Sequence, residues 1–277
     1  MKVTTLGTGW PLPSADRAGA ATLVEAGGQH FLVDCGRGVL MRLAAAGVGV
    51  GQVNTVFLTH LHSDHIVDFN DVVTTSWIGS FAPTPLRVVG PPGTKAFVEA
   101  TVAMLEDDIC WRMAHHDDLT WRPDIEVTEV TDGVALESGA VRVLAAPTDH
   151  RPVHPTVGYR FEHDGAAVVC AGDTVPCEGL DRLCAGADVY VQTVLRRSAV
   201  EAIPLPRLQD ILDYHSDLAQ AGQTATRAGV GTLVLTHLVP PPPPGTEQEW
   251  ADEVGEHFEG TVVVAEDLTA IEVPPPG

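Results

Sequence analysis

Short runs rich in β-branched and aromatic residues recur along both halves of the chain and constrain its fold more than any other feature. In the first half they cover residues 3–6, 21–25, 30–33, 55–59 and 86–89, and in the second half residues 141–145, 157–161, 167–171, 189–194, 232–236 and 261–264. Gly27-Gly28 and Asp164-Gly165 separate neighbouring runs as hairpin turns do. The sequence therefore predicts two β-rich halves.

Helical periodicity covers three further segments, residues 39–46, 95–109 and 218–228. No Ser/Gly-rich or charge-rich linker divides the chain, since the proline run at 240–244 is short and predicts a stiff extended loop, and residues 274–277 read as a tail. The apolar content of 44% is enough for a sizeable core. We therefore expect one domain over residues 1–277.

The composition restricts where the chain works and what it binds. Its formal net charge of −21 disfavours broad binding to nucleic acid, because phosphate would meet net repulsion. Five cysteines, with no C-x-x-C, suit reduced thiols better than disulfides. The sequence holds neither a signal-peptide core nor an apolar run of membrane-spanning length. We expect a cytoplasmic protein without a membrane partner.

The segment T-H-L-H-S-D-H at 59–65 directly follows an apolar run and packs three imidazoles and one carboxylate into six residues. On leaving a strand, His60 and His62 can face the same way, while Asp64 and His65 can face a second position nearby. A polar surface loop would explain any one of these histidines, but not the spaced set. The segment predicts two neighbouring metal ions, zinc first, with manganese or iron as alternatives.

Further motifs accompany this segment: T-L-G-T-G at 5–9, V-D-C-G at 33–36, His150 followed by G-Y-R at 158–160, A-G-D-T at 171–174, and L-T-H-L at 235–238. Together these motifs resemble those of the metallo-β-lactamase superfamily, in particular its branch that contains ribonuclease Z and the zinc-dependent arylsulfatases. The resemblance extends over nearly the whole chain. It implies an α/β fold with αββα layers, in which two facing β-sheets carry helices outside and a dinuclear zinc site at one rim.

The resemblance also implies the metal ligands. One zinc would be held by His60, His62 and His150, the other by Asp64, His65 and His237, and Asp173 would bridge them. Ligand-type residues thus run across both β-rich halves, so a single domain containing both halves must assemble the site. Without the motif context, Asp173 would be an ordinary turn aspartate and His237 a histidine at a strand end. Asp64 is also expected to take part in catalysis.

Three positions keep alternatives open. His150 or His154 could be the third histidine, and the Pro-Thr-Asp-His sequence at a strand end favours His150. Asp34 could accept the second N–H of a ligand histidine, or it could cap a helix that begins near Arg37. By resemblance, His215 would stabilise or protonate the leaving oxygen, and otherwise it is a polar residue at a helix start.

Two metal ions that share a water molecule lower its pKa far below that of bulk water, toward about 7, and orient the resulting hydroxide. No G-x-S-x-G elbow suggests a serine nucleophile instead. We therefore expect a dinuclear zinc hydrolase that uses a metal-bridging hydroxide on a small ester. A phosphodiester or an aryl sulfate comes first as the substrate, with a lactone behind.

Two other functions remain open. The first is a tRNA 3′-end endonuclease similar to ribonuclease Z, and the second is a metal-binding scaffold without turnover. The endonuclease ranks below the small-ester hydrolase because family members that mature tRNA carry a long arm between the third histidine and the bridging aspartate. Here only 23 residues separate His150 from Asp173, and the chain holds just two lysines. Nucleic acid is therefore not expected as a partner, and the oligomeric state stays open, a homodimer included.

Overall fold

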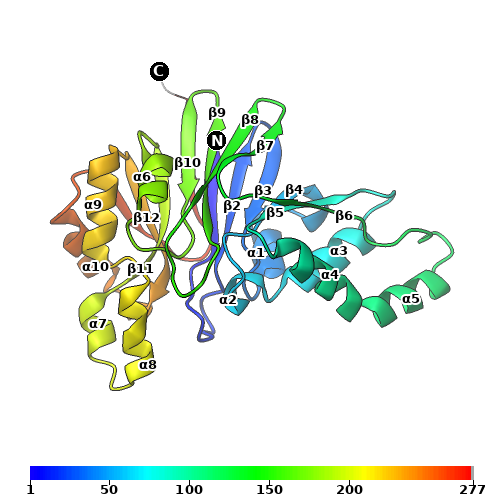
Figure 1. Cartoon of the computed structure of the whole chain (residues 1–277), viewed down its shortest axis with the longest axis horizontal. Coiled ribbons are helices and arrows are strands. Elements are labelled where there is room, and N and C mark those ends of the chain that lie inside the picture. The colour runs from blue at the N-terminus through cyan, green and yellow to red at the C-terminus, as the bar shows by residue number, and fades with distance from the viewer. Residues whose placement is uncertain (276–277) are drawn as a thin grey trace.

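Two seven-stranded β-sheets face each other in the computed structural model, which describes residues 1–275 (Figure 1). In spatial order, the first sheet comprises β14 (Thr269–Glu272), β1 (Lys2–Gly7), β2 (Ala21–Ala26), β3 (Gln29–Val33), β4 (Val53–Phe57), β5 (Leu86–Gly90) and β6 (Ile125–Glu129). The second comprises β13 (Thr261–Val264), β12 (Thr232–Val239), β11 (Val189–Leu195), β10 (Ala166–Cys170), β9 (Val157–His163), β8 (Val141–Pro147) and β7 (Gly133–Ser138). Strands β3 to β6 run parallel, and so do β10 to β13.

Helices cover the outer face of each sheet. The first half contributes α1 (Val39–Ala45), η1 (Val50–Gln52), α2 (Ser63–Ile66), α3 (Phe69–Ile78), α4 (Thr94–Met104) and α5 (Glu106–His115). The second half contributes α6 (Glu178–Cys184), α7 (Arg197–Glu201), α8 (Pro206–Gln209), η2 (Asp210–Asp213), α9 (Leu218–Ala228) and α10 (Glu247–Gly255). In Figure 1 the two groups of helices lie on opposite sides of the paired sheets. The predicted αββα layers are confirmed.

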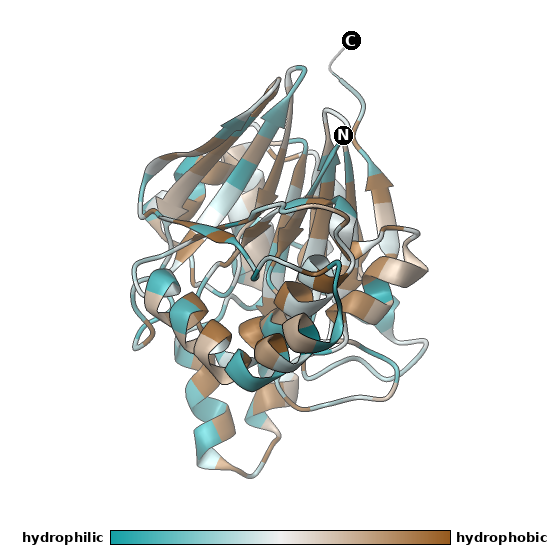
Figure 2. Ribbon diagram, turned by 90° about the vertical axis from the view of Figure 1, so that its right-hand side faces the viewer, coloured by the Kyte–Doolittle hydropathy of each residue, from teal (hydrophilic) through white to brown (hydrophobic). Residues whose placement is uncertain are grey.

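Alternation along the strands sorts side chains between three apolar layers. Phe31 and Val33 of β3 point into the core between the sheets, whereas Leu32 packs under α1 and α3. On β10, Val168 lies in the core between the sheets and Val169 packs under α6 and α9. Successive strand residues face opposite sides, so a sheet covered on both faces needs apolar residues at both. Figure 2 shows hydrophobic stretches along the strands.

The predicted elements agree with the observed ones where the apolar signal is strong. Residues 218–228 and 261–264 match α9 and β13 end to end. Residues 95–109 form two helices instead of one, because the backbone leaves the helical conformation at Leu105, between α4 and α5. The predicted tail at 274–277 ends in two residues that lie outside the described part of the chain.

Elements without a prediction are short, mixed in polarity or at a sheet edge. Edge strands β6 and β14 are half exposed, and three residues of β7 are also exposed, so their sequences lack a buried apolar face. The first sheet also includes β14 from the far end of the chain, which pairs with β1. The two sheets therefore do not correspond strictly to the two halves of the sequence.

The parallel strands place their carboxyl ends at one edge of the two sheets, where predicted ligands follow β4 and β10 and His237 lies near the end of β12. Carboxyl ends of parallel strands are the usual place for a site in α/β folds. Gly172 has φ +66° next to Asp173, and a Cβ there would come 2.7 Å from the Thr59 Cβ. Glycine at 172 therefore lets Asp173 approach the end of β4. No helix within residues 1–275 is long and apolar enough to cross a membrane.

Candidate metal centre

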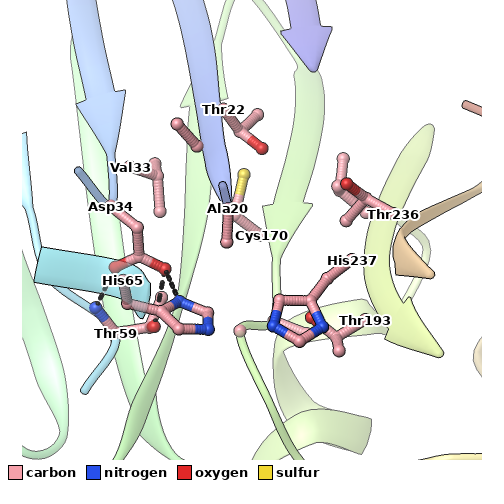
Figure 3. Close-up of a pocket in the computed structure, with 14 residues that line it drawn as sticks. Ala20, Thr22, Val33, Asp34, Thr59, His65, Cys170, Thr193, Thr236 and His237 are labelled. Atoms are coloured by element: carbon pink, nitrogen blue, oxygen red, sulfur yellow. Dashed lines mark hydrogen bonds and ion pairs between the residues drawn. The ribbon is translucent and has the colours of Figure 1, made fainter. Parts of the chain in front are cut away.

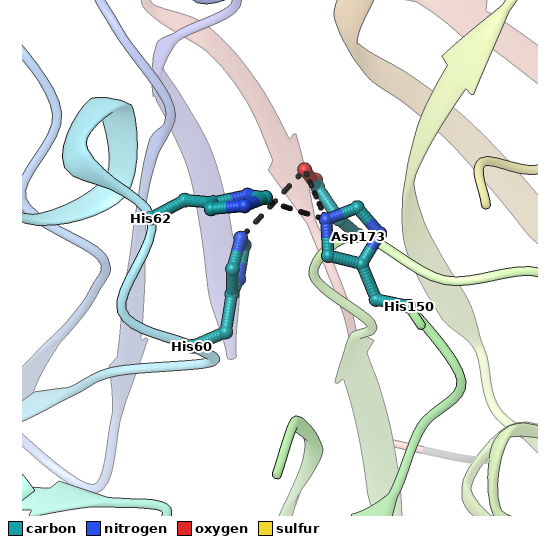
Figure 4. Close-up of side chains that lie close together, drawn as sticks. All are labelled: His60, His62, His150 and Asp173. Atoms are coloured by element: carbon teal, nitrogen blue, oxygen red, sulfur yellow. Dashed lines mark hydrogen bonds and ion pairs between the residues drawn. The ribbon is translucent and has the colours of Figure 1, made fainter. Parts of the chain in front are cut away.

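The structure brings all seven predicted ligands together at this edge, in two adjacent groups. The groups are His60, His62, His150 and Asp173, shown in Figure 4, and Asp64, His65 and His237. Within each group the candidate ligand atoms lie within 4.8 Å of one another. Asp173 Oδ2 lies between the groups, 3.8 Å from His60 Nε2 and 3.4 Å from His65 Nε2. Two groups with a carboxylate between them form a dinuclear metal site.

Several buried ligand atoms at the site have no hydrogen-bond partner, and this indicates whether the residues fit metal ions. His60 Nε2, His65 Nε2 and Asp173 Oδ1 are buried and accept or donate no hydrogen bond within the described residues. A buried polar atom without a partner costs about 1–3 kcal/mol. Several such atoms that converge on one point are the arrangement that a bound cation stabilises. The donor set of imidazoles and carboxylates therefore fits two divalent metals.

The local electrostatics give most of these ligands the protonation state that metals require. Burial holds the pKa of His60 well below its usual range and lowers the pKa of His150 to about 4, so both imidazoles are neutral near pH 7. Burial opposes the charge on Asp173, but His237 and His65 nearby hold its pKa well below the usual range. Metals bind neutral imidazole and ionised carboxylate. These three side chains are thus ready to bind.

Asp34 contacts His65 and Thr59, as Figure 3 shows, and through Thr59 it links one histidine of each group. Its Oδ2 accepts the His65 Nδ1–H at 2.8 Å and the Thr59 hydroxyl at 2.8 Å, and its Oδ1 accepts the Thr59 backbone N–H. The Thr59 oxygen in turn lies 3.0 Å from His60 Nδ1. Both histidines therefore point Nε2 at the metal positions. The alternative helix-capping role fails, because α1 begins after Gly38.

His150 and His154 occupy different surroundings. His150 is fully buried in the first group, and its Nδ1 donates to the Tyr214 carbonyl at 2.8 Å. His154 is exposed and belongs to neither group. Of the two histidines that the sequence left open, the structure therefore brings His150 to the metal centre.

His215 lies at the edge of the centre, outside both ligand groups. Its Nε2 is 3.2 Å from Asp173 Oδ2, and its Nδ1 is 3.2 Å from the Ile211 carbonyl. The side chain is buried, with 6% of its residue surface exposed. Because the Ile211 carbonyl fixes one nitrogen, the other faces the centre in a defined direction.

A pocket with a volume of about 430 Å³ opens beside His62. Two segments form it: Arg151, Pro152 and Val153 after β8, and Arg207, Asp210, Asp213 and Tyr214 around α8 and η2. Arg207 makes no ion pair within residues 1–275, whereas Arg151 pairs with Asp149 at 2.5 Å. These residues stand in no motif of the sequence, so only the structure associates them with the metal centre.

Comparison with known proteins agrees with this geometry. A family model described as a beta-lactamase superfamily domain matches residues 29–238. Ribonuclease Z from Mycolicibacterium gilvum (strain PYR-GCK) is 55% identical over 277 residues, which cover 99% of this chain and 97% of that protein. Ribonuclease Z from Mycobacterium bovis (strain BCG / Pasteur 1173P2) is also 55% identical, over 99% of both chains.

Solved structures share the fold. Human tRNase Z, short form, superposes with a TM-score of 0.75 at 23% identity, over 99% of this chain and 100% of that one. The metallo-beta-lactamase fold protein YhfI from Bacillus subtilis gives a TM-score of 0.74 at 24% identity, over 98% of both chains. At these identities the likeness concerns the architecture alone.

Two expectations about the substrate are therefore wrong. A small-molecule ester was expected and nucleic acid was not, but relatives 55% identical over 99% of the chain are ribonucleases Z. An alignment of 277 residues leaves no room for an inserted arm in those relatives, so the short connection from His150 to Asp173 does not separate this chain from them. The net charge is a sum over the whole chain and does not describe the surface beside His62, where Arg151 and Arg207 lie.

The expected reaction type, metal-dependent hydrolysis of an ester bond, is confirmed. The fold, the two ligand groups and the relatives together make this chain a metal-dependent hydrolase that acts on ester bonds, and not a scaffold without turnover. The likeness to arylsulfatases stays a resemblance in motifs, which no relative described above supports. The chain belongs to the metallo-β-lactamase superfamily and, within it, to the ribonuclease Z family.

Proposed function

We propose that this protein is an endonuclease that cuts precursor tRNA at its 3′ end. The observation that carries the proposal is the 55% identity to ribonucleases Z along almost the whole chain, combined with an uninterrupted set of ligand side chains. The bond cut would be a phosphodiester. Hydrolysis would need no nucleophilic side chain, because bound metals would supply an activated water.

Zinc is the metal we propose for both positions, since imidazole and carboxylate ligands in a compact buried group suit it. His60, His62 and His150 would hold one ion, Asp64, His65 and His237 the other, and Asp173 both. The bound ions supply activation of water and neutralise charge on the phosphoryl oxygens. Asp34 keeps His60 and His65 in the tautomers that present Nε2.

Asp64 and His215 are the side chains we propose for proton handling. Burial opposes the charge on Asp64, but the hydrogen bond from His237 and the nearby His65 lower its pKa to about 2, so the carboxylate is ionised and can accept a proton from water. His215 points Nε2 into the centre. When the P–O bond to the 3′ oxygen breaks, a proton from His215 would neutralise that oxygen, which leaves a 3′ hydroxyl on the tRNA.

The pocket beside His62 supports RNA as the substrate. Arg151 and Arg207 supply positive charge there, and the Tyr214 ring offers a face on which a base could stack. The pocket also contains the carboxylates of Asp210 and Asp213, which repel phosphate and so restrict where the RNA backbone can lie. A nucleotide next to the scissile bond fits this mixture of charge and aromatic surface.

The experiment compares two substrates for the zinc-loaded protein. One is an end-labelled precursor tRNA with a 3′ trailer, and the other is bis-(p-nitrophenyl) phosphate. We expect a single cut at the tRNA 3′ end, at a rate that the diester does not approach. An Asp173→Ala variant controls for contaminating nuclease and should be inactive. Random cleavage along the tRNA, or no cleavage while the diester is hydrolysed, would contradict the proposal.

A further inference from the structure

A small polar cavity adjoins the metal centre, lined by residues of both sheets, and two of its lining residues are the ligands His65 and His237 (Figure 3). The cavity has a volume of about 30 Å³. Its polar lining comes from Thr22, Asp34, Thr59, His65, Cys170, Thr193, Thr236 and His237. Every one of these side chains is buried. The cavity therefore brings a row of hydroxyl groups to the back of the ligand histidines.

His237 differs from the other buried histidines of the centre in what holds its second nitrogen. His65 Nδ1 contacts Asp34, His60 Nδ1 contacts Thr59, and His150 Nδ1 contacts the Tyr214 carbonyl, at 2.8 to 3.0 Å. His237 Nε2 faces the centre, 3.0 Å from Asp64 Oδ2. Its Nδ1 is buried and has no hydrogen-bond partner within residues 1–275. His65 and His237 both line the cavity, but the second nitrogen of His65 is held by Asp34 and that of His237 is not held.

One threonine hydroxyl of the cavity lining is unpaired as well, whereas the Thr59 hydroxyl donates to Asp34. Thr236 Oγ1 is buried without a partner within the described residues. Thr22 and Thr193 also line the cavity. Figure 3 shows Thr193 and Thr236 beside the His237 ring. A buried hydroxyl or imidazole N–H without a partner costs about 1–3 kcal/mol. Two such groups around one space indicate that something polar fills it.

We propose that the cavity holds one or two ordered water molecules that bind His237 Nδ1–H and the hydroxyls of Thr193 and Thr236. A water needs roughly 10–15 Å³ of such space and two to four polar partners, and the cavity supplies both. A cation fits poorly, because both oxygens of Asp34, the lining carboxylate, are already engaged by Thr59 and His65. The ligand is therefore water.

This water gives His237 the support that Asp34 gives His65. By accepting the Nδ1–H, it keeps that nitrogen protonated and leaves the Nε2 lone pair free for the metal group of Asp64 and His65. Such outer hydrogen bonds change metal affinity by about tenfold to a hundredfold. Thr193 and Thr236 are then positioning residues, which act on His237 through the water.

The first test measures metal affinity by competition with a chromogenic chelator, without reference to turnover. Thr193→Val and Thr236→Val keep the side-chain shape and remove the hydroxyl, so each should weaken binding at one of the two metal positions by about tenfold or more. Thr193→Ser restores the hydroxyl and should restore affinity. Thr4→Val is the matched control, because Thr4 also buries an unpaired hydroxyl but lies outside the cavity. Wild-type affinity in both valine variants would overturn the proposal.

The second test observes the water and the tautomer directly. A high-resolution crystal structure of the metal-loaded wild type should show ordered water within hydrogen-bond distance of His237 Nδ1. ¹⁵N spectra should show His237 protonated at Nδ1 in the wild type, and a change in that signal in Thr193→Val that Thr193→Ser reverses. An empty cavity, or a His237 signal that is the same in all three proteins, would overturn the proposal even if a valine variant folds poorly.

Discussion

Two residues of the metal centre hold a left-handed backbone, Asp34 with φ 62° and His237 with φ 45°. Such conformations are uncommon outside glycine and concentrate at functional sites, where the surroundings hold them in place. Asp34 is held by three hydrogen bonds to Thr59 and His65. A strained backbone therefore aims each side chain where an ordinary strand residue could not point.

Most of the individual metal ligands could be predicted from the sequence because each residue stands in a short motif. The sequence favours His150 over His154 but does not decide between them, since the two lie four residues apart and both follow the same strand. Burial separates them: His150 donates to Tyr214 O inside the centre, and His154 faces solvent. Arg207 had no sequence signal, because long-range packing alone brings it to the centre, whereas Tyr214 directly precedes the predicted His215.

Substituting either histidine tests the assignment. His150→Ala should remove a ligand and lower the bound metal to about one ion per chain or less, with turnover lost. His154→Ala is the matched control and should keep the metal content and activity of the wild type. Elemental analysis after gel filtration measures the first quantity, and precursor tRNA cleavage the second. The opposite pattern would move the ligand to His154.

His215→Ala should separate catalysis from metal binding. The side chain lies outside both ligand groups, so metal content should stay at the wild-type level. Loss of a general acid typically lowers the rate by about 10²- to 10⁴-fold. Single-turnover cleavage of precursor tRNA measures this effect. A wild-type rate would return His215 to a structural role at the start of α9.

At the scale of elements, the carboxyl ends of β4, β10 and β12 supply Thr59 to His65, Asp173 and His237, whereas α8 and η2 supply the pocket. Apolar, regularly patterned segments such as α9 could be predicted to the residue. Helices α7 and α8 could not, because each is short and mostly half exposed, with Val200 as the one buried residue between them. The segment that shapes the pocket therefore carried the weakest signal.

Arg207 on α8 should contribute a phosphate contact. Arg207→Ala should weaken precursor tRNA binding and reduce the slope of log K against log salt by about 1, because one fewer counterion is released. Filter binding of metal-free protein at several salt concentrations measures this slope. Arg142→Ala is the control, since Arg142 lies at the opposite end of β8 from His150. Equal slopes for both variants would remove Arg207 from the RNA surface.

At the scale of the whole molecule, we propose that residues 1–277 form a single domain. The first and last strands pair, with Lys2 opposite Glu272, and the Met1 amino group donates to the Val273 carbonyl. Leu238 of the second sheet also donates its backbone N–H to Thr8 near the first. Neither half has all of its strands or all of its ligands without the other.

A single domain should unfold in one cooperative transition. Trp77 lies in the first half and Trp250 in the second, and both are buried. The chain has five tryptophans, so two variants that keep only Trp77 or only Trp250, with the other four replaced by Phe, report on each half. The two midpoints and the midpoint by far-UV circular dichroism should coincide for the metal-saturated protein. Two separated transitions would divide the chain into independent units.

Net charge is the whole-molecule property that misled the substrate prediction. A value of −21 predicts solubility and repulsion at a distance, but contact with RNA depends on the few residues near the scissile bond. Fold and chemistry could be predicted because motifs and strand patterns are local in sequence. Substrate could not, because the pocket combines Arg151 with Arg207 from distant segments.

The central claim is that this chain assembles two metal positions around Asp173 from both of its sheets. The most direct measurement is a crystal structure of the metal-loaded protein with anomalous diffraction at the zinc edge. We predict two peaks per chain, one bound by His60, His62 and His150, the other by Asp64, His65 and His237, with Asp173 contacting both. A single peak, or none at full metal saturation, would contradict the account.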